Sequence, residues 1–358
     1  MRKYYTRPCN FYYGDNAKRY IRKNKALPLT GNKNIAFDQV EIIERQKGSS
    51  VKSSIYPLRK IKNLNKKIQS IINSDLKRII SKRKNIVGLQ FNKPKIMGIL
   101  NVTPDSFSDG GLYLKESKAY NQANLMIKSG AAIIDIGGES TRPGSKVINK
   151  INEWNRIKKI ILKLKKKFKV IPISLDTRKS YVMEEGIKSG VNIINDVSGL
   201  NFDTKSFAVI NSKKIPFILH HMKGTPDTMQ SNPKYDDVLL DIYDFFETKI
   251  NYSIKRGYKK NLTIVDPGIG FGKNLKHNLR LLSKISIFHS LGCPILIGTS
   301  RKKFIKHIVT KFDTPDRTGG TLASVLYGLS QGVQLFRVHN VKEVNQGILV
   351  FNKILNTN

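Results

Sequence analysis

Short runs of apolar residues recur along the last three quarters of the chain. Most of them are separated from the next by a segment long enough to form a helix. Buried parallel strands are continuous apolar runs because both of their faces are covered, and their alternation with helices is typical of β-α-β units. The eight runs are 95–101, 132–138, 170–176, 191–196, 215–221, 262–266, 294–300 and 333–339.

Eight strand–helix units within residues 93–358 match the size and the strand number of a (β/α)8 barrel. The sequence therefore predicts an α/β protein with a TIM-barrel domain over this range. An open, doubly wound sheet uses the same units and is the alternative architecture.

Residues 1–92 do not share this pattern, and we expect them to form a separate N-terminal extension of unknown role. Within it, the pattern of residues 26–45 predicts short strands around the turn Thr30-Gly31-Asn32. The small, polar stretch 48–54 is typical of a linker. The spacing of apolar residues in 58–84 predicts a basic amphipathic helix that packs on its own domain.

The role of this extension is open between two interpretations. In the first it is dispensable for the chemistry, because all eight predicted strands follow Lys93. In the second, residues 26–45 or the basic helix cap the open N-terminal end of the barrel or join a subunit interface. Truncation would then reduce stability and would not remove a catalytic group.

The net charge is unusually positive. The chain has 64 Lys and Arg against 26 Asp and Glu, a formal charge of +38, of which +17 lies in residues 1–92 and +21 in residues 93–358. A basic protein attracts polyanions. However, the charge is spread along the chain, no nucleic-acid motif accompanies it, and an AT-rich genome favours Lys, Asn and Ile. A nucleic-acid partner is therefore not expected.

Several cellular settings are disfavoured by the composition. No run approaches the roughly 18 apolar residues that a membrane helix needs, so no membrane contact is expected. The two cysteines, Cys9 and Cys293, cannot form a disulfide framework or a Cys-rich zinc site. The N-terminus lacks the apolar core of a secretory signal, while a mitochondrial transit peptide is the less favoured alternative. We expect a cytoplasmic protein.

Polar residues follow nearly every apolar run. In a TIM barrel these positions meet on the C-terminal rim, where the βα loops build the active site. Their convergence exceeds what solvation of strand ends explains and predicts an enzyme. The residues are Asn101, Asp176, Asn195, Asp196, His221, Asp266, Ser300, Arg337 and His339.

Two loops and one group of side chains indicate the chemistry. The loop 101–111 offers oxygen ligands that suit Mg²⁺ together with substrate phosphates. The loop 137–144 is rich in small residues and contains Thr141 and Arg142, which are natural phosphate contacts. Asp176, Asn195 and Asp266 are hydrogen-bond acceptors at the ends of the third, fourth and sixth runs. Together with Lys302 they could form hydrogen bonds along the edge of a heterocycle. Each acceptor alone could equally be a helix N-cap.

The motifs NVTPDSFSDGG (101–111) and GAAIIDIGGESTRPGS (130–145) resemble the paired signatures of dihydropteroate synthases, the folate-pathway enzymes that sulfonamides inhibit. The resemblance continues in order over about residues 93–358. The stretch 26–45 resembles, more loosely, an N-terminal segment of some bacterial members. The further motifs are LDT, INDVSGL, HHMKGTPDTMQ, DPGIGFGKN, SRK and RVH.

This resemblance implies a reaction and a site. A transferase would condense 6-hydroxymethyl-7,8-dihydropterin pyrophosphate with 4-aminobenzoate to give 7,8-dihydropteroate and pyrophosphate. It implies Mg²⁺ at Asn101, aminobenzoate at Phe107, Pro143 and Ser300, and a homodimer. It also implies that Thr141, Arg142, Asp176, Asn195, Asp266, Phe271, Lys302, Arg337 and His339 bind the pterin pyrophosphate. Among these, Asp176, Lys302, Arg337 and His339 would be the catalytic group.

Two other function classes remain as alternatives. A pterin-dependent methyltransferase barrel shares the Asp and Asn residues at similar strand ends, but it expels no pyrophosphate and should lack both long motifs. A basic polyanion-binding protein that retains an inactive barrel should have lost rim residues, and none of those named above is missing.

Overall fold

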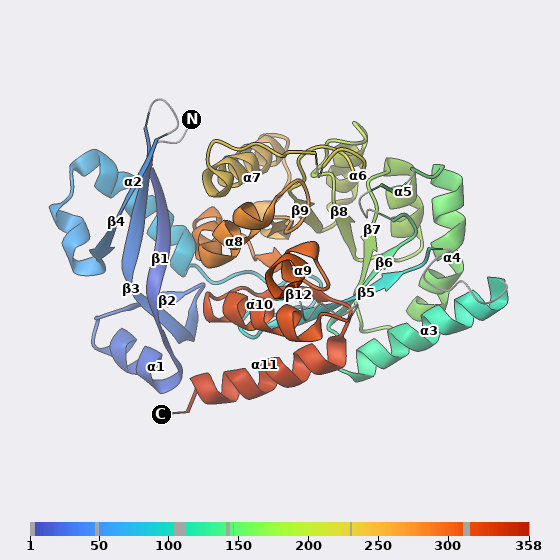
Figure 1. Cartoon of the computed structure of the whole chain (residues 1–358), viewed down its shortest axis with the longest axis horizontal. Helices are drawn as coiled ribbons and strands as arrows, with labels where there is room; N and C mark the ends of the chain where they lie inside the picture. Colours follow the sequence, from blue (N-terminus) through green and yellow to red (C-terminus); the bar gives the residue numbers. More distant parts are fainter. Residues whose placement is uncertain are drawn as a thin grey trace.

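The structure is a computed structural model of the chain. It describes residues 4–46, 50–103, 112–140, 144–145, 147–229, 231–310 and 316–357. Figure 1 shows two parts side by side, a barrel and a smaller N-terminal domain. Four predicted site residues, Phe107, Thr141, Arg142 and Pro143, lie outside the described residues.

Eight parallel strands form the barrel, and each of the eight predicted runs contains one of them. The strand order is β10-β9-β8-β7-β6-β5-β12-β11, and a bridge between Val265 and Ile295 joins the two ends. The predicted TIM barrel is therefore confirmed. The strands are β5 (Lys95–Asn101), β6 (Ile133–Gly137), β7 (Ile173–Asp176), β8 (Ile193–Asp196), β9 (Phe217–His220), β10 (Thr263–Asp266), β11 (Leu296–Ile297) and β12 (Leu335–Val338).

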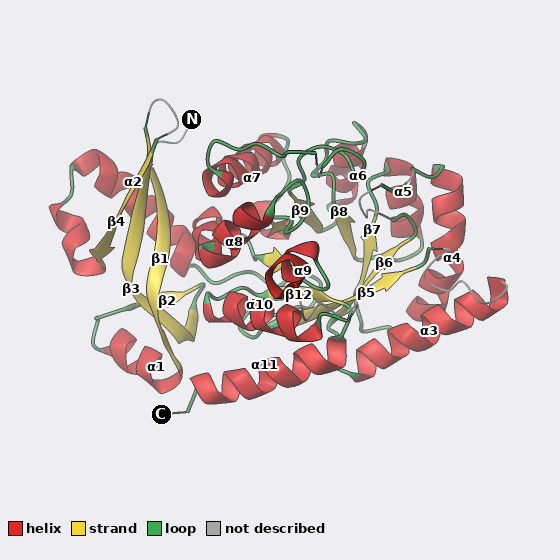
Figure 2. Cartoon of the chain, in the orientation of Figure 1, coloured by secondary structure: helices red, strands yellow, loops and turns green. Residues whose placement is uncertain are grey.

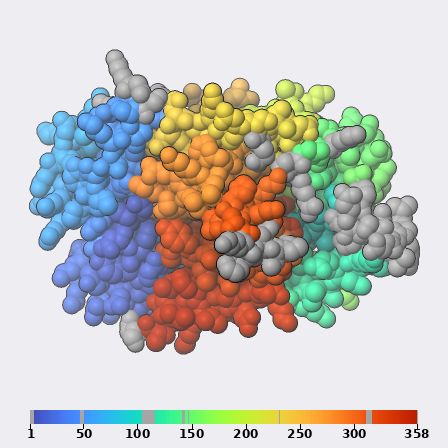
Figure 3. Space-filling model, in the orientation of Figure 1, coloured from blue at the N-terminus to red at the C-terminus, as the bar shows by residue number. Residues whose placement is uncertain are grey.

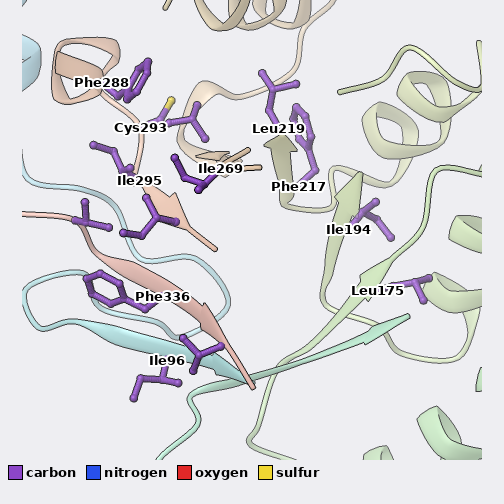
Figure 4. Close-up of a cluster of buried hydrophobic side chains, with 14 of the residues drawn as sticks. Ile96, Leu175, Ile194, Phe217, Leu219, Ile269, Phe288, Cys293, Ile295 and Phe336 are labelled. Atoms are coloured by element: carbon purple, nitrogen blue, oxygen red, sulfur yellow. The ribbon is translucent and has the colours of Figure 1, made fainter. Parts of the chain in front are cut away.

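Helices surround the strands, as Figure 2 shows. Outward-facing strand residues such as Leu175, Phe217 and Phe336 are buried against them in the main core (Figure 4). The α-helices are α3 (Leu112–Lys128), α4 (Lys150–Lys167), α5 (Ser180–Lys188), α6 (Ser206–Lys213), α7 (Val238–Lys255), α8 (Leu275–Ser283), α9 (Lys303–Val309), α10 (Thr318–Ser330) and α11 (Val341–Leu355). Two 3-10 helices, η4 (Lys260–Leu262) and η5 (Ile285–Leu291), accompany them. Within the described residues, no helix has the length and apolar character needed to cross a bilayer.

The inside of the barrel has an apolar floor and a polar upper layer. The floor is a separate buried cluster that includes Ile133, Ile193, Ile264 and Leu335. Because side chains alternate along a strand, the residue two positions later also points inward. In these four strands that residue is polar: Asp135, Asn195, Asp266 and Arg337.

The N-terminal end of the barrel is closed by a short segment that follows the N-terminal domain. Ile86, Leu89 and Phe91 are buried in the same cluster as the floor residues, and Ile86 pairs with Leu89 in a small bridge. The cap is therefore residues 86–91, and this part of the first 92 residues packs with the barrel.

The N-terminal domain is a four-stranded antiparallel sheet with two α-helices. Its long strand β3 pairs with β1 on one side and with β2 and β4 on the other. The predicted strands within 26–45 are confirmed. The elements are β1 (Tyr4–Tyr13), α1 (Gly14–Arg22), β2 (Leu27–Leu29), β3 (Asn32–Arg45), β4 (Val51–Pro57), η2 (Leu58–Asn63) and α2 (Lys66–Ile80).

The linker predicted at 48–54 is wrong where the structure describes it. Residues 51–54 belong to β4 and pair with β3. Residues 52–55 are exposed, which explains why small and polar residues stand there without breaking the strand. The predicted amphipathic helix is confirmed as α2, whose Ile72 and Ile79 pack in the core of its own domain.

The N-terminal domain docks closely on the barrel (Figure 3). Tyr5 of β1 is fully buried, stacks edge-on against Tyr243 of α7 and donates to Asp244. Arg45 of β3 pairs with Asp241 at 2.6 Å. The buried Glu41 pairs with Arg7 of its own domain and with Lys284 of the barrel. The extension is thus joined to the barrel by buried apolar and charged contacts.

Candidate active site

The polar upper layer of the barrel brings together most of the predicted site. Asp176 ends β7, Asn195 lies on β8, Asp266 ends β10 and Arg337 lies on β12. All face the barrel interior, because they share the strand parity that places Ile193, Ile264 and Leu335 in the floor. Arg337 and Asp176, 161 positions apart in the sequence, thereby meet directly in a hydrogen bond.

Arg337 lies between two carboxylates. Its Nε donates to Asp135 Oδ2 at 2.6 Å, and its Nη2 donates to Asp176 Oδ2 at 2.7 Å. Asp135 also accepts from Asn195 Nδ2 at 3.1 Å. Sequence reasoning missed Asp135. The available signal was a carboxylate inside the otherwise apolar run 132–138, where burial demands a partner.

Burial shifts the proton affinities of these groups. It raises the pKa of Asp176 to about 7, against the attraction of Arg337. Burial likewise raises the pKa of Asp266 to about 6, although a hydrogen bond from Gly268 opposes the shift. Burial and the nearby Arg337 lower the pKa of Lys302 to about 8. The site therefore contains groups that change charge near neutral pH, which is typical of functional sites.

The loop after β10 is held by a lysine that points into it. Lys273 is buried, and its Nζ donates to the carbonyls of Gly268 at 2.9 Å and Phe271 at 2.8 Å. These contacts place the Phe271 ring beneath Lys302, whose Nζ lies 3.9 Å from the ring centroid. Sequence reasoning included Phe271 and Lys302 but missed the positioning role of Lys273. The terminal lysine of a glycine-rich loop was its only signal.

Ser300 contacts His339, which was also predicted to lie in the site. The Ser300 Oγ accepts from the His339 backbone N–H at 3.2 Å and lies 3.0 Å from Nδ1 of the same residue. Because the hydroxyl already accepts one hydrogen bond, its own proton is available for Nδ1. If Ser300 donates, His339 carries its proton on Nε2; the contact is equally compatible with donation from Nδ1 to the second lone pair of the hydroxyl. Ser300 thus orients His339, whatever its role toward aminobenzoate.

A buried ionic cluster holds the base of the GGESTRPG loop. Glu139 accepts from Arg178 at 2.9 Å and from Lys179 at 2.7 Å, and Lys179 also pairs with Glu153. Glu139 Oε1 further accepts from the backbone N–H of Ile148 at 3.0 Å. The two ends of the loop are therefore held together by one side chain. Sequence reasoning did not single out this cluster.

Asn101, the predicted metal ligand, is half-buried at the end of β5. Among the described residues no cluster of three or more His, Cys, Asp or Glu side chains could hold a metal ion. The donor available on β5 is thus a neutral amide oxygen. Mg²⁺ in phosphate-transfer sites uses few protein ligands and takes the remaining oxygens from water and substrate phosphates. Asn101 fits that pattern.

The described part of the site is suited to ligand recognition by hydrogen bonds and charge. The upper layer offers carboxylate and amide acceptors, two cations and one aromatic ring around a shared interior. Such a set suits a flat heterocycle with donors and acceptors along its edge. When the three carboxylates of Asp135, Asp176 and Asp266 are ionised, they outnumber the cations Arg337 and Lys302, an arrangement that would stabilise a developing positive charge on a bound ligand.

Comparisons with known proteins agree with this site. Residues 97–339 match the family model described as pterin binding enzyme. The dihydropteroate synthase of Escherichia coli K12 is 41% identical over 267 residues, which cover 75% of this chain and 94% of that protein.

Solved structures agree as well. The crystal structure of Yersinia pestis dihydropteroate synthase with a sulfonamide drug superposes with a TM-score of 0.71 at 38% identity, covering 75% of this chain and 97% of that one. The Xanthomonas albilineans dihydropteroate synthase in complex with 7,8-dihydropteroate gives a TM-score of 0.68 at 31% identity, with 75% and 97% coverage.

Proposed function

The chain belongs to the pterin-binding enzyme family as a dihydropteroate synthase, and from this premise we propose how its residues carry the reaction. The enzyme condenses 6-hydroxymethyl-7,8-dihydropterin pyrophosphate with 4-aminobenzoate in folate biosynthesis. The observation that carries the proposal is the inward-facing layer in which Arg337 bridges Asp135 and Asp176 beside Asn195.

The bond changes define what the site must do. The aminobenzoate nitrogen donates its lone pair to the pterin methylene carbon and later loses one proton. The bond from that carbon to the pyrophosphate oxygen breaks, and its electron pair leaves with pyrophosphate. Positive charge grows on the methylene, and negative charge grows on the leaving oxygens. Groups placed in advance at these two positions lower the barrier.

We assign the pterin end to the upper layer. Asn195, Asp266 and Lys302 hydrogen-bond the ring edge, and Phe271 supports Lys302 from below. Asp176 in its ionised form lies where it can stabilise the methylene cation. Arg337 is held between two carboxylates, so its guanidinium plane is fixed when it stacks on the ring or meets the leaving group.

The leaving-group end is assigned to Thr141, Arg142 and His339. When Ser300 donates to Nδ1, the proton of His339 is on Nε2, which makes this nitrogen a donor to phosphate oxygen. Aminobenzoate is assigned to Phe107, Pro143 and Ser300. Only His339 and Ser300 of these residues lie within the described part of the chain.

Mg²⁺ is proposed as the cofactor, with Asn101 as its protein ligand. When bound, the ion neutralises charge on the pyrophosphate as its bond to carbon lengthens. Purified protein is assayed for dihydropteroate with both substrates, with Mg²⁺ and with excess EDTA. We expect product with Mg²⁺ and none with the chelator. Product that persists in excess EDTA would contradict the role of Asn101. Absence of product under every metal condition would contradict the proposed function.

A homodimer is proposed from the family and from an apolar surface. Leu349, Val350 and Ile354 of α11 and Tyr327 of α10 are at least half exposed, and the two helices contact each other. Leu349→Lys should yield monomer in sedimentation experiments, whereas Val170→Lys, at an apolar residue that is 90% exposed elsewhere, should not. A wild-type monomer would contradict the dimer.

We also propose a cytoplasmic location, which two buried cysteines with free thiols support.

A further inference from the structure

Asp135 is the deepest charged residue of the polar upper layer. It is fully buried in β6, two positions beyond the floor residue Ile133 and two before Gly137 at the end of the strand. It shares that layer with Asn195 and Arg337, and the mechanism above gives it no contact with either substrate. Its contacts are with two residues that do have such roles.

The first contact fixes which way the Asn195 amide faces. Asp135 Oδ2 accepts from Arg337 Nε, so it acts as a carboxylate acceptor. Asn195 contacts the same oxygen at 3.1 Å, and only its NH2 group can donate there. Its Oδ1 atom therefore faces the other way.

That oxygen is an acceptor without a donor. Asn195 is 2% exposed, and its Oδ1 has no hydrogen-bond partner among the described residues. A buried polar atom in this state is unfavourable until a donor reaches it. The pterin ring carries N–H donors along its edge, so bound substrate would relieve the unpaired acceptor.

The second contact fixes Arg337. Asp135 accepts a hydrogen bond from Nε and Asp176 accepts one from Nη2, so the guanidinium is held at two separate nitrogen atoms. Loss of Asp135 would leave Arg337 attached to Asp176 alone and free to turn about that contact.

We infer that Asp135 is a positioning residue that sets the hydrogen-bond polarity of Asn195, making it an acceptor for a ring N–H of the pterin. This inference rests on the proposed function for the identity of the ligand. It is tested by pterin binding alone, which needs neither aminobenzoate nor catalysis.

Exchanging the residue types at positions 135 and 195 leaves the total charge unchanged. It therefore separates an effect on the orientation of the Asn195 amide from a general loss of protein stability. In Asp135→Leu, the acceptor that holds the Asn195 NH2 group and Arg337 Nε is removed, so the Asn195 amide is free to turn. In Asn195→Asp, two carboxylates face each other. In the double variant Asp135→Asn/Asn195→Asp, the new Asn donates to the new Asp, which again presents an acceptor to the ligand, and the total charge equals that of the wild type.

The probe is 6-hydroxymethylpterin, and its affinity is measured by fluorescence titration on protein that melts cooperatively. We expect Asp135→Leu and Asn195→Asp each to bind at least tenfold more weakly, and the double variant to recover to within about threefold of wild type. Ser174→Ala is the matched control. Ser174 lies opposite Asp135 on β7, is buried, and its hydroxyl has no partner in the described structure. Its affinity should be unchanged.

Two results would overturn the inference. The first is Asp135→Leu binding the pterin as tightly as wild type. The second is a double variant that binds no better than Asn195→Asp, a comparison that stands even if Asp135→Leu fails to fold. Failure of the proposed function is a distinct outcome, in which wild-type protein with Mg²⁺ yields no dihydropteroate even though its pterin affinity can be measured.

Discussion

The junction between the N-terminal domain and the barrel and the upper layer of the barrel both contain buried charged groups, but they differ in how these groups are paired. At the junction, Glu41 is 3% exposed and pairs with both Arg7 and Lys284. In the barrel, Asp135 and Asn195 each keep one buried oxygen without a partner among the described residues. Both oxygens of Glu41 are thus paired, whereas Asp135 and Asn195 are left incomplete.

The pKa values of a carboxylate from each region, Glu41 and Asp176, are shifted in opposite directions. Burial acts to raise the pKa of Glu41, but hydrogen bonds from Lys284 and Arg7 outweigh it and lower the pKa. Burial raises the pKa of Asp176 to about 7 although Arg337 is bound to it. A saturated carboxylate contributes to stability, whereas an incomplete one is ready to interact with a ligand. We therefore assign domain docking to the junction and the catalytic reaction to the upper layer of the barrel.

The largest effect is expected at the junction. Glu41→Ala leaves Arg7 and Lys284 largely buried without their carboxylate, and loss of one partner from a buried pair costs about 3 kcal/mol. Thermal unfolding should begin several degrees lower, while kcat/KM of the folded protein stays within about twofold. Glu185→Ala removes the more exposed pair with Lys188 and should leave the melting temperature close to that of wild type, because solvent screens such a pair. A large fall in kcat/KM would mean that the junction reaches the active site.

Lys302→Ala should give the opposite pattern. Lys302 is half-buried at the rim and makes its aromatic contact with Phe271, so its loss removes a charged hydrogen bond to the ring and little core packing. We expect kcat/KM to fall about a hundredfold, about 2.7 kcal/mol of barrier, with a melting temperature close to that of wild type. Lys303→Ala, at the exposed next residue, is the control. Loss of the cooperative melt in Lys302→Ala would show that this lysine is structural.

A smaller effect is expected from pH. Asp266 and Asp176 must be ionised to accept from the pterin, so kcat/KM should rise as pH passes about 6 and about 7. Lys302 must keep its proton to donate, so kcat/KM should fall above about pH 8. In Asp176→Asn the rising limb should move down toward pH 6. Because the groups interact, the limbs report apparent pKa values of the set. A flat profile from pH 5 to 9 would contradict these assignments.

The sequence predicted the barrel and its rim well because both follow from local rules. Continuous apolar runs mark buried parallel strands, and strand ends in a barrel meet on one face. These two rules were enough to bring Asp176, Asn195, Asp266 and Arg337 together. The long loop motifs then indicated the chemistry through their resemblance to a family.

Residues that act through other residues were harder to predict. Asp135 and Glu139 pair with side chains 39 to 202 positions away, and nothing nearby in the sequence names those partners. Lys273 acts within its own loop, but burial of its side chain in that loop depends on the fold. The linker prediction failed for a related reason. Residues 51–54 form a strand because β3 offers a pairing edge, although their own composition is polar and small.

Our central expectation is that the residues before the barrel cap contribute to the stability of the protein and not to the reaction in the active site. The direct measurement is turnover per folded molecule of a chain that begins at Asn85, which keeps the cap 86–91 and every rim residue. We expect this chain to be less soluble and less stable, because Tyr243 and η5 lose their cover. Its soluble, cooperatively melting fraction should form dihydropteroate within about threefold of the full-length rate. A decrease of more than about a hundredfold in that fraction, about 2.7 kcal/mol, would show that the N-terminal domain supplies part of the active site.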